Sequence, residues 1–570
     1  MLKKLLVLLF FVTISFNSIA SPHYTIFYGG DIITMEGTAT EYVEAVVAEE
    51  DKIVYIGSVE HAFKHYPNSS TKFNLKGRTL LPGFIDPHAH PASIGAFILS
   101  HDIIAAHDWK LPHKTYPGVS GHGNYLQAIK TLINEKKDPS QSVVIWGYNK
   151  LWHGDLSLKE LDEATQQTPT IILHHSTHEI FVNSTAMKQY AIDSNKIKAK
   201  KHADTTNNHF WGKAFLELKK DKLDSVFSDP KALKLGMDRV SNMLLQNGIT
   251  AITELGFPSE NLEREYSTLK YATEKSPYYS VYLIPGMSEE VALKMRVHQY
   301  FKRINTYAEK YNTQNITFLP NQFHIVVDGS IYDLSLQMQE DFLNCADCKS
   351  EWTIPLKNSE ILFNYYWNKN YKIHVDINGD LGVKKYNAIV KRALEKNPRE
   401  DHKTTYHNLG YFTSYEAQNM ATLDIKASVN PNYLWALSDK YNEVGFGAKR
   451  ADNMVASRQL TKRGIPVSLH SEFPLAPANP LHLAWVAANR IVASGKIKRP
   501  VESLSMFNTI KGITLTAART LDLENELGSI KEGKQATFTI LKQNPFKIDP
   551  FNIKDIPVAG VVYKGKVKLN

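Results

Sequence analysis

The sequence predicts an α/β protein, in which a (β/α)8 barrel of the TIM type carries a small β-sandwich assembled from both chain ends. Two observations lead to this prediction. From Leu80 to about Leu523, short apolar strands alternate regularly with amphipathic helices, which is typical of a (β/α)8 barrel. β-rich stretches also lie on either side of that region. We therefore expect residues 80–523 to form the barrel, and residues 21–79 and 524–570 to form the sandwich.

Strand and turn patterns define the two parts of the predicted sandwich. In the first part, the turn Glu49–Asp51 separates two apolar runs, as expected for a hairpin. The strands expected in the two parts are Tyr24–Phe27, Asp31–Met35, Ala45–Ala48, Lys52–Ile56, Gln535–Leu541, Val558–Tyr563 and Gly565–Leu569.

The barrel region contains short apolar runs of the length that buried parallel strands require. Helical patterns separate them, so each run is expected to pair in parallel with its neighbours. The first strand begins at Leu80, and the others are expected at Val143–Trp146, Thr170–His174, Gly248–Glu254, Tyr279–Leu283, Phe323–Val327, Lys372–Val375, Lys426–Val429 and Pro466–His470.

The composition indicates a folded globular protein. The 570 residues are 43% hydrophobic and 22% charged, so the chain has enough apolar side chains for a large core. The net charge of +8 is spread along the chain without a dense block of lysine and arginine. These features argue against a disordered or fibrous protein and against nucleic acid as the partner.

The first twenty residues have the features of a secretory signal peptide. Lys3 and Lys4 precede an apolar run, Leu5–Phe16, and Ser18–Ala20 provides small residues at the positions that a signal peptidase reads. The run is too short to cross a bilayer, and no other stretch predicts stable membrane insertion. We expect cleavage after Ala20 and a secreted or periplasmic mature protein.

Histidines follow the first barrel strand in a spacing that suits a metal ion. In Leu80–Pro91 an apolar strand runs into His88 and His90, whose side chains should point to the same face. Paired imidazoles at a strand end bind divalent ions, although two polar residues at a strand end also occur without a metal. Further strand-like runs end in His374, in His407, and in His470 with Glu472. Because carboxyl ends of barrel strands meet at one edge, this combination predicts a metal site.

The chain resembles the amidohydrolase superfamily, in the YtcJ-like branch (amidohydrolase family 3) that includes N-substituted formamide deformylases. The resemblance covers nearly the whole mature chain and is specific for the superfamily rather than for a substrate. It is carried by Glu44–Gly57, Pro82–His90, His178–Ala186, Val327–Ser330, His374–Asp380, His407 and Gly528–Ala536.

The resemblance implies an exported metal-dependent hydrolase that cleaves a C–N bond, of amide or formamide type, in a small molecule by means of metal-activated water. Glu472 would be the general base and then the acid, and His407 or His178 would help to polarise the scissile carbonyl. His178 equally fits a purely structural role. A homodimer is compatible with the resemblance.

Three departures from the family pattern bear on the metal. His324 stands where the branch usually has the lysine whose carbamate bridges two ions, Glu472 replaces an aspartate, and Tyr406 replaces the glutamate before His407. We therefore expect one ion, Zn²⁺ or similar, held by His88, His90, His374 and Glu472 with His407 nearby. A second ion held by His324 and His407 is the main variant. A metal-free barrel is the remaining alternative.

Two other functions fit the same residues. One is a non-catalytic binding or regulatory protein of the kind called AepA-like, which the departures favour. The other is an esterase or lactonase that uses the same metal. The retained histidines and carboxylate favour the hydrolase of C–N bonds.

The two cysteines, Cys345 and Cys348, form a C-x-x-C pair. In an exported protein a local disulfide is expected, and a redox or metal role is the weaker alternative. The segment Gln339–Thr353 follows the Asp-Gly-Ser loop, so we expect it to lie over the barrel mouth as a stiffened lid.

Overall fold

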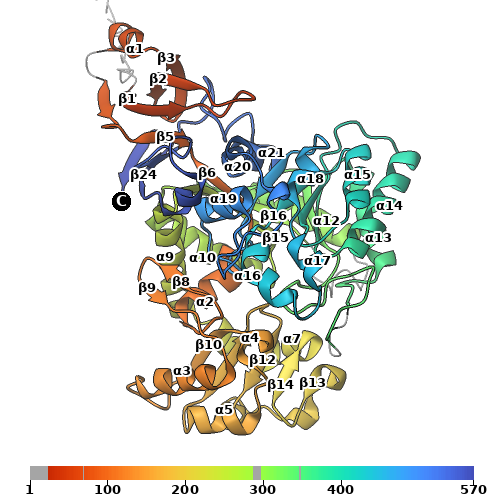
Figure 1. The fold of residues 1–570 in the computed structure, drawn as a ribbon. Helices are drawn as coiled ribbons and strands as arrows, with labels where there is room; N and C mark the ends of the chain where they lie inside the picture. The colour runs from red at the N-terminus through yellow and green to blue at the C-terminus, as the bar shows by residue number, and fades with distance from the viewer. Residues whose placement is uncertain (1–22, 68–69, 287–296, 346–347, 349) are drawn as a thin grey trace, which may run out of the picture.

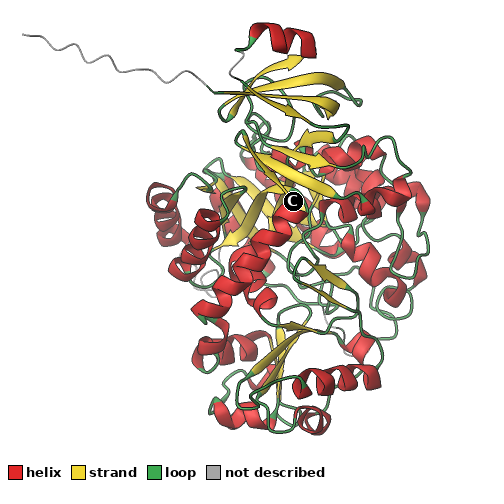
Figure 2. Cartoon of the chain, turned by 90° about the vertical axis from the view of Figure 1, so that its left-hand side faces the viewer, coloured by secondary structure: helices red, strands yellow, loops and turns green. Residues whose placement is uncertain are grey.

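A computed structural model describes residues 23–67, 70–286, 297–345, 348 and 350–570. Three parts follow one another along the long axis of the molecule (Figures 1 and 2). A sheet built from both chain ends lies at one end, a ring of parallel strands surrounded by helices lies in the middle, and a second, inserted sheet lies at the opposite end. The predicted signal peptide, residues 1–20, lies outside the described residues.

The two chain ends join in one eight-stranded sheet, with strand order β25-β24-β23-β5-β1-β2-β3 and β4 paired to β1. The sequence predicts a sandwich here, and the structure shows a single hydrogen-bonded sheet. Phe27 and Phe538, from opposite ends of the chain, pack against each other within its core. Its elements are β1 (Tyr24–Ile33), β2 (Tyr42–Glu49), β3 (Lys52–Gly57), α1 (Val59–His65), β4 (Thr71–Asn74), β5 (Thr79–Pro82), β23 (Phe538–Leu541), β24 (Val558–Tyr563) and β25 (Lys566–Leu569).

Parallel strands form the central ring of the TIM-barrel type. One sheet has the order β17-β16-β15-β6 and the other the order β18-β19-β20-β21-β22. Parallel bridges between Gly286 and His324, and between Ala89 and Phe473, join the two sheets at both edges. The strands are β6 (Phe84–Ala89), β15 (Ile249–Phe257), β16 (Ser280–Pro285), β17 (Ile316–Phe318), β18 (Gln322–Val326), β19 (Lys372–Ile377), β20 (Thr405–Asn408), β21 (Lys426–Val429) and β22 (Val467–Leu469).

Helices between and after these strands cover the outside of the ring (Figure 2). Their amphipathic patterns place an apolar face on the strands, as α9 does with Met237, Val240 and Leu244. The main ones are α2 (Ala96–Ser100), α9 (Pro230–Gln246), α10 (Leu262–Lys275), α12 (Val297–Tyr311), α13 (Leu356–Trp367), α14 (Asp380–Lys396), α15 (Ser414–Thr422), α16 (Asn432–Tyr441), α17 (Ala448–Asp452), α18 (Ser457–Thr461), α19 (Pro480–Asn489), α20 (Met506–Gly512) and α21 (Leu515–Thr520).

Two of the predicted barrel strands belong elsewhere. Val143–Trp146 and Thr170–His174 lie in β10 (Val143–Tyr148) and β11 (Thr170–His174) of the inserted sheet, whose order is β13-β14-β12-β11-β10-β7. The prediction was wrong because the insertion also alternates apolar strands with helices, and periodicity does not reveal which strands pair. The other elements here are β7 (Asp102–Ile103), β12 (Glu179–Val182), β13 (Ala203–Asp204), β14 (His209–Trp211), the hairpin β8 (Trp109–Leu111) and β9 (Lys114–Tyr116), α3 (His122–Asn134), α4 (Lys150–His153), α5 (Leu158–Thr165), α6 (Ser184–Gln189), α7 (Gly212–Asp221) and α8 (Asp224–Phe227).

The chain passes from the end sheet into the barrel at Gly83. β5 ends at Pro82 and pairs with β23 of the end sheet, whereas β6 begins at Phe84 and pairs with β15 of the barrel. The sequence predicts a single strand from Leu80 and a domain boundary after residue 79. The boundary lies a few residues later because the Pro-Gly pair divides that strand between two sheets.

The loop after β18 is fixed to the end of β19 by one buried carboxylate. Asp328 accepts backbone hydrogen bonds from Gln337, Asn378 and Gly379 at 2.8–3.0 Å. A Cβ on Gly379 would lie 2.0 Å from the backbone oxygen of Gln337, so this close approach requires glycine. The Asp-Gly-Ser motif is therefore structural here, since it sets the path of the chain above the strand ends.

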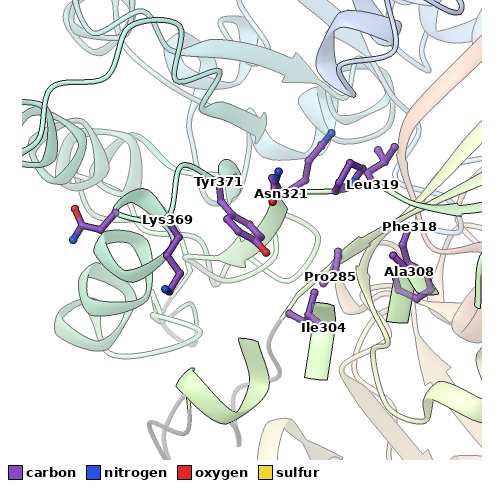
Figure 3. A pocket seen from close by; sticks show the side chains of 11 residues that line it. Pro285, Ile304, Ala308, Phe318, Leu319, Asn321, Lys369 and Tyr371 are labelled. Carbon is purple, nitrogen blue, oxygen red and sulfur yellow. The ribbon is translucent and has the colours of Figure 1, made fainter. Parts of the chain in front are cut away.

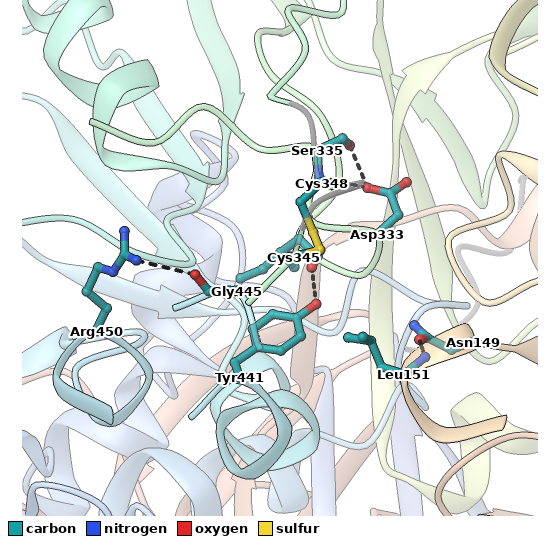
Figure 4. Close-up of a disulfide and its surroundings, with 10 residues drawn as sticks. Asn149, Leu151, Asp333, Ser335, Cys345, Cys348, Tyr441, Gly445 and Arg450 are labelled. Atoms are coloured by element: carbon teal, nitrogen blue, oxygen red, sulfur yellow. Dashed lines mark hydrogen bonds between the residues drawn. A yellow bond between two sulfur atoms is a disulfide. The ribbon is translucent and has the colours of Figure 1, made fainter. Parts of the chain in front are cut away.

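Cys345 and Cys348 form a disulfide, as the sequence predicts (Figure 4). Leu343 makes a two-way backbone bridge with Gly445, and the buried guanidinium of Arg450 donates to the backbone oxygens of residues 340 and 341. These contacts hold the cysteine segment against the connection between α16 and α17, which follows strand β21.

Among the described residues, no helix combines the length and apolar character that a membrane crossing requires.

Candidate metal centre

Side chains from several strand ends meet inside the barrel. His88 and His90 leave β6 on the same face, as predicted, with ring centroids 5.3 Å apart. The ring of His88 is fully buried, whereas the side chain of His90 is 26% exposed. His88 therefore lies within the barrel and His90 lies at its opening.

Asp376 of β19 is a central member of this group that the sequence analysis missed. Its Oδ2 lies 3.0 Å from Nε2 of His324 and 3.7 Å from Nε2 of His88. His324 comes from the neighbouring strand β18, in parallel pairing with β19. The signal available in the sequence was its position, because Asp376 follows His374 by two residues and so shares its strand face.

His374, predicted as a metal ligand, lies deeper in the barrel. Both of its ring nitrogens are used in hydrogen bonds, Nε2 with Gln322 at 2.8 Å and Nδ1 with His407 at 2.9 Å. The sequence predicts His374 as a ligand, whereas the donor on this strand that makes no hydrogen bond is Oδ1 of Asp376. Alternation along a strand identifies the inward face but not the layer, and two residues correspond to about 6.6 Å along the strand.

Several buried polar atoms at this point make no hydrogen bond, although Nε2 of His324 lies within ion-pair distance of Asp376. Their chemistry tests whether a metal ion fits the site. Both ring nitrogens of His88, Nε2 of His324, Oδ1 of Asp376 and Nδ1 of His407 are buried and make no hydrogen bond. A buried polar atom left unpaired costs about 1–3 kcal/mol, so such a concentration in one site is unfavourable. Imidazole nitrogen and carboxylate oxygen are the donors that a divalent ion such as Zn²⁺ takes. The residues present therefore fit a divalent metal ion.

Three of the histidines are close enough to share one ion. Donor atoms of His88, His407 and His470 lie within 4.8 Å of one another, the one such group among the described residues. His470 differs from the other two because its Nδ1 bonds to Ser428 at 2.8 Å and its Nε2 to Asn408 at 2.9 Å. His470 is thus held by hydrogen bonds, and the free donors belong to His88 and His407.

Glu254 of β15 holds the other histidine of the pair. Its Oε1 lies 3.3 Å from Nδ1 of His90, and its Oε2 accepts the backbone N–H of Ala92 at 2.6 Å. Burial by itself would lower the pKa of His90, but the hydrogen bond and charge of Glu254 outweigh it and raise the pKa. Glu254 therefore holds the Nδ1 side of the His90 ring.

Glu472 lies beside the histidines with two hydrogen-bond donors. The hydroxyl of Tyr433, from α16, bonds its Oε2, and Nδ2 of Asn408 donates to its Oε1 at 3.3 Å. Burial raises the pKa of Glu472 to about 7, even though the Tyr433 hydrogen bond lowers it. A carboxyl group with a pKa near neutrality can both accept and release a proton at physiological pH.

The family profile of the amidohydrolases matches residues 72–568. The chain belongs to the amidohydrolase family. It is 23% identical to the protein named amidohydrolase YtcJ of Bacillus subtilis (strain 168), over 95% of this chain and 98% of that one. It is also 21% identical to LONG AFTER FAR-RED 3 of Arabidopsis thaliana, over 93% and 88% of the two chains.

The fold of this amidohydrolase is also found in a solved structure. The crystal structure of an uncharacterised metal-dependent hydrolase from Pyrococcus horikoshii superposes with a TM-score of 0.68 at 16% identity, covering 92% of this chain and 99% of that one. Family and fold together support metal-dependent hydrolysis in general terms.

The three residues that depart from the family pattern, His324, Glu472 and Tyr406, lie at different positions relative to the metal centre. His324 lies next to Asp376, so the position of the family lysine still faces the site. Glu472 lies at the centre with the donors described above. Tyr406 alternates to the other side of β20, where its ring packs against Tyr386 of α14, so it does not face the metal ligands.

His178 is placed on the inserted sheet, just before β12. Its side chain is exposed, and its backbone N–H donates to Oγ of Ser176. The structure therefore places His178 on the insertion, and does not bring it into the group around His88.

A cavity of about 580 Å³ is also present in the barrel region (Figure 3). It is lined by residues such as Pro285, Phe318 and Tyr371, where β18 and β19 begin. Active sites in such barrels lie at the opposite, carboxyl ends of the strands. We therefore assign the chemistry to the histidine and carboxylate group rather than to this cavity.

Proposed function

We propose that this amidohydrolase binds a divalent metal ion, Zn²⁺ or similar, and hydrolyses a C–N bond of amide or formamide type in a small molecule. The concentration of unpaired donor atoms carries the proposal. His88, His324, Asp376 and His407 each present a buried atom without a hydrogen bond, and all of these are metal-binding atom types. A barrel that had lost its metal would gain stability by replacing these groups with apolar ones, since barrel interiors are normally packed with branched apolar side chains.

His88, His324, Asp376 and His407 would hold the ion, with His90 at the opening. When bound, a divalent cation acts as a Lewis acid and lowers the pKa of water toward neutrality. The set expected from the sequence was His88, His90, His374 and Glu472 with His407 nearby. The proposed set keeps His88, replaces His374 by Asp376, adds His324 and His407, and gives Glu472 the role of base.

Glu472 would accept a proton at Oε2 or Oε1 and return it to the departing nitrogen. Two donors orient the group, the hydroxyl of Tyr433 and the amide of Asn408. A nitrogen leaving group requires a proton to depart, and a carboxyl with a pKa of about 7 can provide one at neutral pH. This requirement supports a C–N bond as the target over an ester.

The experiment is metal analysis combined with a matched substrate panel. The purified protein would be stripped with a chelator and reloaded with Zn²⁺, Mn²⁺ or Co²⁺. It would then be assayed on N-formyl and N-acyl amines and on the esters of the same acyl groups. We expect bound metal, metal-dependent turnover of amides, and loss of turnover with retained metal in Glu472→Gln. No metal uptake would refute the metal hydrolase, and turnover of esters alone would refute the C–N specificity.

We further propose that the protein is exported by a signal peptide cleaved after Ala20. The lysines, apolar run and small residues of its first twenty positions support this proposal. Intact-mass analysis of the protein from its host should give a chain that starts at Ser21, found in the periplasm or medium. A full-length chain in the cytoplasm would refute export.

A further inference from the structure

A chain of hydrogen bonds runs through the barrel interior beneath the metal centre. It connects the backbone carbonyl of Leu521, the amide of Gln322, the ring of His374 and the ring of His407. We propose that this relay fixes the ring tautomer of His407, so that its buried Nδ1 keeps the lone pair that a metal ion requires. Gln322 and His374 are then positioning residues. The inference rests on the proposed metal site and adds what orients one of its ligands.

The direction of the relay is set by its first member. The carbonyl of Leu521 can only accept a hydrogen bond, so the Gln322 atom that lies 2.8 Å from it must be the NH₂ group. The other end of the same amide, Oε1, then faces Nε2 of His374 at 2.8 Å. Because Oε1 can only accept, the proton of this bond is on Nε2 of His374.

The second step follows from the neutral state of His374. The ring is fully buried, and its two hydrogen-bond partners are an amide oxygen and an imidazole nitrogen, so no carboxylate is bonded to it to stabilise a charged form. A neutral ring protonated on Nε2 carries a lone pair on Nδ1. Nδ1 lies 2.9 Å from Nε2 of His407, which must therefore donate.

The last step leaves a lone pair at the metal centre. His407 is also fully buried, and no acceptor lies within hydrogen-bond distance of its Nδ1, so the proton on Nε2 is its only ring proton. Its Nδ1 therefore has a lone pair, is buried, and makes no hydrogen bond. His407 belongs to the group of three histidines, with His88 and His470, whose donor atoms lie within 4.8 Å of one another. The relay thus keeps Nδ1 of His407 in the deprotonated form that a metal ion requires.

The nearby His470 shows how a buried histidine is hydrogen-bonded without this relay. Both of its nitrogens are engaged, with Ser428 and Asn408, so it presents no free lone pair. The two histidines lie in the same buried layer, with ring centroids 5.8 Å apart, and differ in their hydrogen-bond partners. Partners, rather than residue type, decide which of the two is a ligand.

The first test is the tautomer of His407 in the metal-free protein, measured by long-range ¹H–¹⁵N NMR on protein with ¹⁵N-labelled histidine. The His407 signals would be identified in a His407→Gln variant. We expect wild-type His407 and His374 both to be protonated on Nε2 and not on Nδ1. A proton on Nδ1 of His407 would overturn the proposal. This measurement requires neither activity nor a stable relay variant.

The second test is Zn²⁺ affinity, measured by calorimetric titration of Gln322→Leu. Loss of an outer hydrogen-bond partner typically weakens metal binding about 10–100-fold, and we expect that range together with mixed tautomers at His407. The matched control is Ser468→Ala, which removes another buried 2.8 Å hydrogen bond, to Thr520, near the same end of the barrel and without a histidine. It should leave the affinity and the tautomer unchanged.

The outcomes separate the two proposals. If wild type binds no divalent ion while His407 shows the expected tautomer, the proposed metal function fails and the relay stands. If wild type binds Zn²⁺ and Gln322→Leu binds it equally well with an unchanged tautomer, the relay is refuted and the metal site stands. Equal weakening in Ser468→Ala would also refute the relay, because it would assign the effect to general loosening of the barrel.

Discussion

Asp376 provides the sharpest test of the site, because the sequence pointed to His374 instead. In Asp376→Asn the side chain keeps its size and loses the charge that lies 3.0 Å from His324 and 3.7 Å from His88. We expect metal affinity to fall at least about hundredfold, the upper end for loss of an outer partner. Asp380→Asn is the matched control, since that carboxylate is satisfied by the backbone and side chain of Gln339.

The loss of metal affinity in Asp376→Asn can be measured by thermal unfolding with and without Zn²⁺. At free metal one hundred times the dissociation constant, binding stabilises the folded state by about 2.7 kcal/mol. A hundredfold weaker site at the same metal concentration yields about 0.4 kcal/mol. Wild type and Asp380→Asn should therefore show a clear metal-induced rise in Tm, and Asp376→Asn almost none. If Asp376→Asn kept the full rise and bound metal content, the reasoning from unpaired buried atoms would be refuted.

Three further predictions concern other parts of the molecule. Tyr433→Phe removes a hydrogen bond that lowers the pKa of Glu472, so the acidic limb of kcat/KM should move to higher pH; an unmoved limb would exclude Glu472 as the base. Burial alone would raise the pKa of Glu179, but His174, His209 and His178 hold it at about 2, so its contribution to stability should be complete above pH 4.5 and disappear as pH falls toward 2. Tm measured against pH should show this loss in wild type and not in Glu179→Gln. Reduction of the Cys345–Cys348 disulfide should change KM more than Tm, and a large fall in Tm with unchanged kinetics would contradict the lid.

Local patterns in the sequence predicted what depends on near neighbours. The H-x-H pair, the later strands and the acidic residue after β22 all follow from alternation and apolar runs, and the structure has them where expected. The C-x-x-C pair is likewise a local feature. These predictions succeed because strand periodicity and turn chemistry act over a few residues.

Only the tertiary structure decided which strands pair and how deep each side chain lies. β10 and β11 have the same apolar pattern as barrel strands, and their place in a separate sheet depends on partners far away in the chain. His374 and Asp376 share one inward face, so the sequence cannot tell the positioning residue from the ligand; the packing of β18 and β20 on either side decides it.

The sequence by itself thus determined the family, the barrel class and the chemistry of the donors. The tertiary structure decided which donors keep a free lone pair. His407 lies in β20 and His470 follows β22, with one strand between them, and the two histidines differ in their hydrogen-bond partners. Those partners, Gln322 through His374 for one and Asn408 for the other, come from strands far apart in the chain, where no local pattern in the sequence records them.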